Sequence, residues 1–282
     1  MPSSPALDHD WLGACRAAAE GLRAVLHEHP TSQERVIETG VIGEGGDKTL
    51  VIDAEAEDRV FAELQHLHDD GARFTVVSEE RGTVDFGSED ILVVVDPIDG
   101  SLNAKRGLPH HALSVAVATG TTMADVVFGF VYDLGPGEEW RATLGAGAFL
   151  NDQPLDHPPP ERRTPDGRLE LVAIESADPR WLALASDDLV AATRRIRAMG
   201  SIAVSMCQVA ATRVDAMASL ARCRAVDAAA AQLVVRESGG QVAFAGAPGG
   251  PLAAPLDLVP RFPVVAARTP DSLQALLALP AV

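Results

Sequence analysis

The 282-residue chain carries 40 acidic against 23 basic side chains, a formal charge of −17, and 47% of its residues are hydrophobic. This composition excludes a disordered chain, because so much apolar surface can form a core, and the negative charge opposes non-specific binding to nucleic acid and anionic membranes. No apolar run approaches the roughly 20 residues that span a bilayer, and residues 1–10 lack the pattern of a signal peptide. We expect a cytoplasmic protein of one large domain or two closely packed halves.

Three cysteines, Cys15, Cys207 and Cys223, are widely spaced in alanine- and valine-rich surroundings. Their odd number and spacing predict small buried thiols, because neither a disulfide framework nor a zinc site fits this pattern.

Two helices are predicted in the first part of the chain. Apolar residues recur at three- and four-residue intervals over Leu7–His29, a pattern that Pro30 ends. A second amphipathic helix follows the glycine-rich loop at residues 43–48, with Asp53 at its entrance. A carboxylate there either complements the helix dipole or takes part in catalysis.

A short strand, Phe74–Ser78, is predicted to deliver Glu79 and Glu80 to its carboxyl end. Adjacent glutamates usually mark a solvated turn. A second strand that ends in Asp96 follows, however, and neighbouring strand ends can bring several oxygen ligands to one hard cation.

Residues 91–101 read Ile-Leu-Val-Val-Val-Asp-Pro-Ile-Asp-Gly-Ser, an apolar run typical of a buried strand that ends in a rigid turn. One interpretation is a purely structural Asx-Pro turn. Pro97 restricts the bend, however, so that Asp96 and Asp99 can point at one place. The Gly-Ser pair that follows could begin a helix, whose N–H groups suit a phosphate bound beside a divalent metal.

Two polar pairs follow this motif. Lys105 and Arg106 could meet a substrate anion, or they could simply be solvated. His110 and His111 are neighbours that point apart, and no further His or Cys completes a metal set, so we expect a core or rim role.

An antiparallel meander is predicted next, over Ala112–Val117, Asp125–Tyr132 and Glu138–Thr143. The proline-rich and charged stretch Asp156–Gly167 is the best candidate for a hinge between two halves.

Beyond the candidate hinge we expect a strand at Leu169–Ile174, a helix at Leu182–Thr193 and a helix over Ile202–Ala211 that Gly200-Ser201 opens. A Gly-Ser helix start can be a plain cap or a ligand site. Asp227 then opens an alanine-rich helix that Gly239-Gly240 closes, which reads as an N-cap with a C-terminal glycine.

The motif at residues 96–101, preceded by the Glu79-Glu80 pair, resembles the signature of the inositol monophosphatase family in the fructose-1,6-bisphosphatase superfamily. The segment at residues 145–151 is similar to the family's G-x-G-A-F-x-N, and residues 222–240 resemble its second signature, with Asp227 as the aspartate. The resemblance covers about Trp11 to Pro263.

This resemblance implies an α/β (α+β) fold, the layered αβαβα sandwich of sugar phosphatases, and a homodimer. We expect residues 1–155 to form an N-terminal α+β half that carries most of the metal ligands. Residues 156–282 are expected to form a C-terminal α/β half that supplies Asp227 and substrate contacts.

The resemblance also assigns roles. It implies a Mg²⁺-dependent phosphatase with two or three ions, for which Mn²⁺ may substitute. The expected metal ligands are Glu79, Asp96, the Ile98 carbonyl, Asp99 and Asp227, with Glu80 beside them. Asp53, at the family's spacing from Asp47, and the Ser101 hydroxyl would activate water, while the Gly100 and Ser101 amides hold phosphate. Substrate contacts are expected from Gly200, Ser201, Ala203, Arg222 and Arg224.

Several positions depart from the pattern of typical inositol monophosphatases, and they bear on the substrate. Leu220 stands where a sugar-binding Glu is expected, Val226 replaces a common Trp, and Ala104 replaces an aromatic residue. Arg222 and Arg224 look like the arginines of archaeal enzymes that act on both inositol monophosphate and fructose 1,6-bisphosphate, although both could be solvated.

Inositol monophosphate is therefore the first expected substrate. Fructose 1,6-bisphosphate, histidinol phosphate and 3′-phosphoadenosine 5′-phosphate are alternatives. The competing class is a metal-binding regulatory module without turnover.

Overall fold

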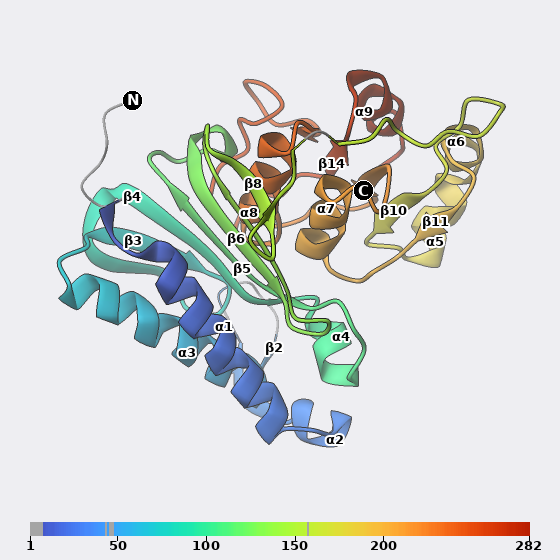
Figure 1. Ribbon diagram of the computed structural model, residues 1–282. Helices are drawn as coiled ribbons and strands as arrows, with labels where there is room; N and C mark the ends of the chain where they lie inside the picture. The colour runs from blue at the N-terminus through green and yellow to red at the C-terminus, as the bar shows by residue number, and fades with distance from the viewer. Residues whose placement is uncertain (1–7, 43, 45–47, 157) are drawn as a thin grey trace.

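The computed structural model describes residues 8–42, 44, 48–156 and 158–282, and shows two β-sheets with helices on their outer faces and between them (Figure 1). Helices α1 and α3 cover one face of a seven-stranded sheet, and α7 and α8 lie between this sheet and a five-stranded sheet. Helices α5, α6 and α9 pack on the far face of the second sheet. These five layers confirm the predicted αβαβα sandwich.

The outer helical layer forms as its apolar periodicity predicts. Helix α1 (Trp11–Glu28) begins where the Asp10 side chain accepts a hydrogen bond from the Gly13 N–H, and it buries one apolar stripe. Helix α3 (Val51–Asp69) packs beside it. Between them lie the short helix α2 (Ser32–Arg35) and a two-stranded arm, β1 (Glu38–Ile42) and β2 (Lys48–Leu50).

Arg35 links the outer helical layer to the helix that contains Ala104 through hydrogen bonds. The Arg35 guanidinium donates to the Leu26 carbonyl at 2.9 Å and, through Nε, to the His29 carbonyl at 2.6 Å, near the C-terminal end of α1. It also donates to the Ala104 carbonyl of α4 (Ser101–Arg106) at 2.8 Å. Two helices far apart in sequence are therefore held at a fixed spacing.

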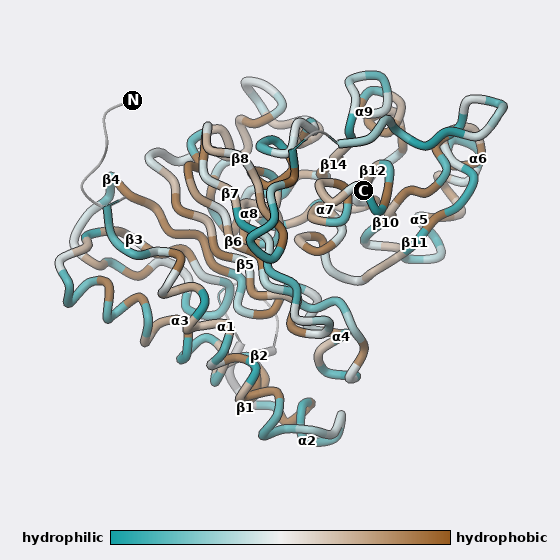
Figure 2. The backbone as a smooth tube through the Cα atoms, viewed as in Figure 1, coloured by the Kyte–Doolittle hydropathy of each residue, from teal (hydrophilic) through white to brown (hydrophobic). Residues whose placement is uncertain are grey.

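The seven-stranded sheet has its strands in chain order, and the predicted meander forms its centre. Buried apolar residues dominate β3, β5 and the second part of β4, and long hydrophobic stretches colour the neighbouring strands β4, β5 and β6 (Figure 2). The strands are β3 (Phe74–Ser78), β4 (Gly82–Asp99), β5 (Ala112–Ala118), β6 (Val126–Asp133), β7 (Glu138–Thr143), β8 (Gly147–Leu150) and β9 (Gln153–Pro154), and a short 3-10 helix, η2 (Met123–Asp125), precedes β6.

Strand β4 is longer than the sequence predicted, because it begins at Gly82 instead of Ile91. Its first part mixes polar and apolar residues, and this hides the strand from a search for apolar runs. Val76 of β3 pairs with both Val84 and Val93, so β3 contacts both parts of β4.

The second sheet is mixed and has the order β11-β10-β12-β14-β13. The predicted strand Leu169–Ile174 is shifted to Val172–Glu175, and the predicted helix Leu182–Thr193 is two helices joined at Ala185. Asp178 and Pro179 start the first of these early, because an Asp cap with Pro at the first position favours a helix start. The elements are β10 (Val172–Glu175), α5 (Pro179–Leu184), α6 (Ser186–Ala192), β11 (Ile196–Arg197), α7 (Ile202–Ala210), β12 (Ala216–Ser219), α8 (Ala225–Glu237), β13 (Gln241–Phe244), β14 (Val264–Ala267) and α9 (Pro270–Leu277).

The alanine-rich sequence of α8 explains how this helix fits between two sheets. Its residues 225–235 are all buried, and small side chains allow strand β6 to approach its backbone. A Cβ atom built on Gly129 of β6 would lie 2.6 Å from the Ala230 carbonyl oxygen. Only glycine fits at this contact without a backbone shift.

We expect Gly129→Ala to lower the free energy of unfolding by about 1–3 kcal/mol, because a methyl group must displace main-chain atoms of α8. Thermal melting should show a Tm lower by several degrees, since about 1 kcal/mol corresponds to roughly 2–4 °C in a domain of this size.

Gly21→Ala in α1 is the matched control. The built Cβ faces the flexible Arg59 side chain, and alanine favours the helix. A Gly129→Ala protein as stable as Gly21→Ala would contradict this description of the contact.

Candidate active site

Three buried aspartates converge where the two sheets meet. Carboxylate oxygens of Asp96, Asp99 and Asp227 all lie within 4.8 Å of one another, and the three residues are 1%, 7% and 7% exposed. Asp96 and Asp99 come from the end of β4, and Asp227 from the first turn of α8. We call these three carboxylates, with the neighbouring Glu79, the carboxylate cage.

The turn predicted after the apolar run places the first two carboxylates. The Asp96 Oδ1 atom accepts the Ile98 N–H at 2.9 Å, which closes a turn around Pro97. Asp99 accepts the Ser201 hydroxyl at 2.5 Å and the Ala203 N–H at 2.7 Å. Asp99 therefore joins the first sheet to the start of α7.

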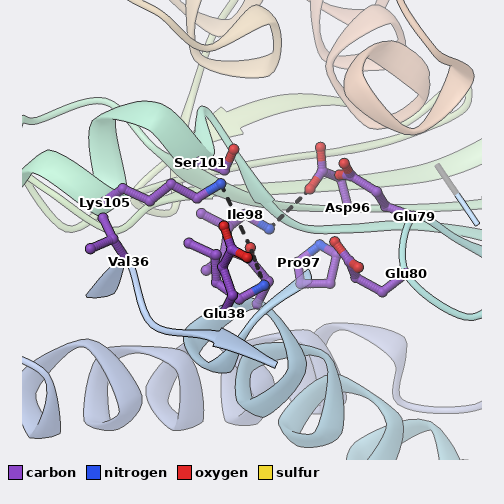
Figure 3. A pocket seen from close by; sticks show the side chains of 11 residues that line it. Val36, Glu38, Glu79, Glu80, Asp96, Pro97, Ile98, Ser101 and Lys105 are labelled. Atoms are coloured by element: carbon purple, nitrogen blue, oxygen red, sulfur yellow. Dashed lines mark hydrogen bonds and ion pairs between the residues drawn. The ribbon is translucent and has the colours of Figure 1, made fainter. Parts of the chain in front are cut away.

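Strand register brings Glu79 to the cage. Ser78 of β3 pairs with Val95 of β4, so the next residues along the two strands, Glu79 and Asp96, lie side by side (Figure 3). This arrangement confirms the prediction that neighbouring strand ends gather carboxylates at one edge.

Arg224 closes the other side of the cage. Its guanidinium donates through Nη1 to Glu79 Oε1, and its Nε atom lies 3.4 Å from Asp227 Oδ1. The Arg224 backbone N–H donates to Asp227 Oδ2 at 2.9 Å, which fixes the aspartate in the first turn of α8. Arg222, two residues earlier, is exposed.

Burial and mutual repulsion raise the pKa values of Glu79, Asp96 and Asp99. Burial, with the Asp227 charge, raises the pKa of Asp99 to about 8. Burial raises the pKa of Glu79 to about 7 against the opposing effect of Arg224. The pKa of Asp96 is raised well above its ordinary value, again chiefly by burial and then by Glu79 and Asp99. Burial therefore favours the protonated forms of these three groups, and a bound cation would favour the ionised forms.

A cavity of about 530 Å³ opens beside the cage (Figure 3). Glu79, Glu80 and Asp96 line one side, and Ser101 and Lys105 of α4 line another. The arm contributes Glu38, and Asp53 of α3 lies in the wall.

Asp53 is placed as a reactive group would be. It is 8% exposed, and its Oδ2 atom lies 3.3 Å from the Leu50 N–H and 3.8 Å from the Lys105 ammonium. Its buried Oδ1 atom has no hydrogen-bond partner among the residues that the structure describes. Burial raises the pKa of Asp53, and Lys105 opposes this shift. Asp47, which supplied the family spacing, lies outside the described residues.

One of the expected substrate residues, Gly200, lines a second cavity of about 390 Å³ on the other side of Asp99. Gly200 lines it together with Asn103 and Glu175, and Ser201 and Ala203 follow Gly200 in the chain. In this structure Ser201 and Ala203 bind Asp99, and their contact with a substrate stays a prediction.

Gly100 and Gly200 meet where the two halves of the chain touch. Gly100 has a φ of 87°, and a Cβ atom on it would lie 2.9 Å from the Gly200 and His110 carbonyls. The Asn103 amide donates to the Met199 carbonyl at 2.6 Å and to the His110 carbonyl at 2.9 Å. The signature glycine thus allows a close contact between the halves.

The two histidines do not form a metal pair. His110 Nδ1 lies 2.9 Å from Asp133 Oδ2, whereas His111 Nδ1 lies 3.1 Å from the Leu108 carbonyl. The core or rim role predicted for them is confirmed.

Sequence reasoning undervalued Lys105 and missed Glu38. Lys105 follows Ser101 by four residues, and this spacing places both on one face of a helix, a signal that could have assigned Lys105 to the cavity. Glu38 comes from a short arm whose fold the sequence did not predict, and no motif marked it.

The residues of the cage fit a divalent metal. Three carboxylates whose oxygens lie within 4.8 Å form a hard oxygen donor set. Burial and the neighbouring carboxylates raise the pKa values of Asp96 and Asp99, and a bound cation would favour their ionised forms. Asp53 lines the same cavity and adds a further carboxylate to it. These features suit Mg²⁺ or Mn²⁺ better than metals that prefer sulfur or nitrogen.

Comparison with known proteins agrees with this geometry. The profile described as "Inositol monophosphatase family" matches residues 9–278. The chain is 33% identical over 212 residues to a "Fructose-1,6-bisphosphatase/inositol-1-monophosphatase" of Methanothermobacter thermautotrophicus, covering 71% of this chain and 72% of the relative. It is 37% identical over 198 residues to a protein of the same description from Thermococcus kodakarensis, covering 70% of each. A "Nus factor SuhB" of Pasteurella multocida is 32% identical over 200 residues, 70% of this chain and 71% of the relative.

Solved structures share the fold. One described as an inositol monophosphatase-fructose 1,6 bisphosphatase superposes with a TM-score of 0.79 at 24% identity, covering 95% of this chain and 99% of the other. A Pyrococcus horikoshii protein described as similar to inositol-1 monophosphatase gives 0.77 at 23% identity, with 95% and 97% covered.

The five-layer fold with an acidic cage between its sheets defines a metal-dependent phosphatase. The chain belongs to the inositol monophosphatase family, whose members hydrolyse phosphate monoesters.

The raised pKa values predict how the metal-free protein responds to pH. Asp99 retains its proton in the folded state up to a pKa of about 8 but releases it near 3.8 when unfolded, so folding binds protons between these values. The stabilising contribution is present below the unfolded pKa and is lost as the pH rises through the folded pKa. We therefore expect the Tm of chelator-treated protein to fall from about pH 5 to about pH 8.5.

Mg²⁺ should reverse this trend, because metal binding favours the ionised carboxylates and releases protons. Calorimetric titration at neutral pH in buffers of different ionisation enthalpy should detect those protons. A Tm of the metal-free protein that rises across the same range would contradict the pKa directions.

Proposed function

We propose that this protein is a Mg²⁺-dependent phosphatase that hydrolyses a phosphate monoester of a small polyol or sugar, with inositol monophosphate as the first candidate. One observation carries the proposal: the carboxylate cage borders a cavity that Asp53 and Lys105 also line. Family membership supports the same chemistry.

The proposed metal ligands are Glu79, Asp96, the Ile98 carbonyl, Asp99 and Asp227, with Mn²⁺ as a possible replacement for Mg²⁺. When bound, two or three divalent ions would lower the pKa of a water molecule and offset the negative charge that develops on the leaving oxygen. Glu80 lines the cavity beside Glu79 and would orient it.

Asp53 and Ser101 are the proposed catalytic residues. Asp53 lines the cavity, and its carboxylate would accept a proton from water bound there. The Ser101 hydroxyl lies in the same cavity and would orient that water. The Gly100 and Ser101 amides, where α4 begins, would hold the phosphate.

The second cavity is the proposed place for the polyol or sugar. Asp99, Asn103 and Glu175 line this cavity, and their polar side chains can bind hydroxyl groups. Gly200, Ser201 and Ala203 border it, and Arg222 and Arg224 complete the proposed substrate set.

Fructose-1,6-bisphosphatase activity is the second candidate. Relatives that are 33% and 37% identical carry both activities in their descriptions, and Arg224 provides a guanidinium at the cage that suits a further phosphate. Histidinol phosphate and 3′-phosphoadenosine 5′-phosphate remain substrates to be tested.

We also propose that the protein forms a homodimer, and that residues 1–155 and 156–282 act as two halves. The two sheets of the structure divide the chain between Pro154 and Val172, which supports this boundary.

Release of phosphate from the four candidate substrates, measured with Mg²⁺ present, tests the proposal. We expect hydrolysis of inositol 1-phosphate or fructose 1,6-bisphosphate, and none in the presence of a chelator, because the cage then lacks its ions. Binding of Mg²⁺ without phosphate release from any of the four would favour a regulatory module instead.

Asp99→Asn should lower kcat by at least about 100-fold, since it removes a charge from the cage and ligand changes exceed the effects of outer partners. The fold should persist, because the asparagine oxygen can still accept a bond from Ser201 or Ala203. Circular dichroism and the kinetics of Asp90→Asn, an exposed aspartate, provide the controls. Full turnover by Asp99→Asn would refute the ligand assignment.

Lys105→Met should move the acidic limb of the kcat/KM pH profile to higher pH. The Lys105 ammonium lowers the pKa of Asp53, so its removal raises that pKa, and the ionised base is then reached at higher pH. Arg106→Met, one residue further along α4, is the control. An unshifted limb in Lys105→Met would show that Asp53 is not the titrating base.

A further inference from the structure

Arg224 lies inside the carboxylate cage and bonds to residues from both halves of the chain. Its guanidinium donates to Glu79 at the end of β3 and lies within 3.4 Å of Asp227 Oδ1 on α8. The side chains of Arg224, Glu79 and Asp227 are only 18%, 15% and 10% exposed. This is an ion-pair network shielded from water, so its interactions are weakly screened by salt.

The cage places its negative charges around this one guanidinium. Burial lowers the pKa of Arg224, but the charges of Asp227, Glu79 and Asp96 together raise it above the ordinary value. Arg224 therefore stays charged, and it offsets part of the repulsion that would otherwise oppose folding of the metal-free cage.

The same two carboxylate groups are proposed ligands of a divalent metal. Glu79 and Asp227 are proposed ligands, and their oxygens now accept N–H groups of Arg224. A guanidinium and a metal ion compete for carboxylate lone pairs, and two cations close together also repel each other. Metal binding therefore has to weaken or break these two ion pairs.

We propose that Arg224 is a built-in counter-cation that occupies part of the metal site in the metal-free protein and competes with the incoming ion for Glu79 and Asp227. This inference rests on the proposed ligand assignment. The sequence predicted the same role, substrate binding, for Arg222 and Arg224. In the structure Arg222 is exposed, whereas Arg224 bridges the cage.

Two consequences follow for the protein's own residues. The metal-free chain can fold without a metal, because a side chain supplies a positive charge at the cage. The affinity for metal is correspondingly lower than the carboxylates alone would give, so occupancy depends on the concentration of free ion. Displacement also frees N–H donors of Arg224 at the place where a second substrate anion could bind.

Mn²⁺ binding to the full-length, chelator-treated protein tests this competition, with free Mn²⁺ measured by electron paramagnetic resonance. We expect Arg224→Gln to bind Mn²⁺ at least about tenfold more tightly than the wild type, a change of ~1.4 kcal/mol. Arg197→Gln removes the same charge from an exposed position outside the cage and should leave the affinity unchanged. Equal or weaker Mn²⁺ binding by Arg224→Gln would overturn the proposal.

Thermal melting provides a second measurement. Metal-free Arg224→Gln should melt below the wild type, because its cage has lost the counter-cation, and saturating Mn²⁺ should remove the difference. If Arg224→Gln does not fold, Arg224→Lys carries the test. It keeps the charge but cannot bridge two carboxylates as a guanidinium does, so its Mn²⁺ affinity should still exceed that of the wild type.

Asp99→Asn distinguishes the two ways in which the idea can fail. Loss of Mn²⁺ binding in Asp99→Asn with no gain in Arg224→Gln would overturn the competition alone. Unchanged Mn²⁺ binding in Asp99→Asn would overturn the ligand assignment on which the proposal rests.

Discussion

Repulsion among three buried carboxylates and the partly exposed Glu79 is the constraint that the centre of this structure must satisfy. Glu79, Asp96 and Asp99 are brought together by the pairing of β3 with β4 and by the turn around Pro97, and Asp227 reaches them from the start of α8. Such a cluster is costly without positive charge, because buried charges must be paired or neutralised. Raised pKa values, the Arg224 guanidinium and a divalent cation are three ways to reduce this cost.

The same carboxylates also hold the two halves of the chain in place. Asp99 accepts bonds from Ser201 and Ala203, which start the helix between the sheets. Asn103 donates to the Met199 carbonyl nearby. The site therefore lies at a junction where groups from both halves are already ordered, and a substrate need not assemble them, which lowers the entropy cost of binding.

Much of the site could be predicted from the sequence because its signals are local. The apolar run before Asp96, the rigid turn at Pro97 and the helix that Asp227 opens are short patterns with direct structural meaning. The family resemblance gave the layered fold. Together they were sufficient to predict which acidic residues approach one another.

What the sequence did not show depends on contacts between distant segments. The first part of β4 is half polar and is stabilised by pairing with β3, so no apolar run marks it. Arg222 and Arg224 look alike in sequence, and only the fold buries one of them among carboxylates. Lys105 is one of two adjacent cations, and the turn of α4 decides which faces Asp53.

The Arg35 side chain connects the outer helical layer to α4, a helix that lines the cavity. Its guanidinium binds carbonyls near the end of α1 and the Ala104 carbonyl, and the next residue along the chain, Lys105, lines the cavity. The position of that ammonium is thus set partly by the packing of a helix on the protein surface. A substitution that displaces the end of α1 would therefore also displace α4 and the wall of the cavity that Lys105 lines.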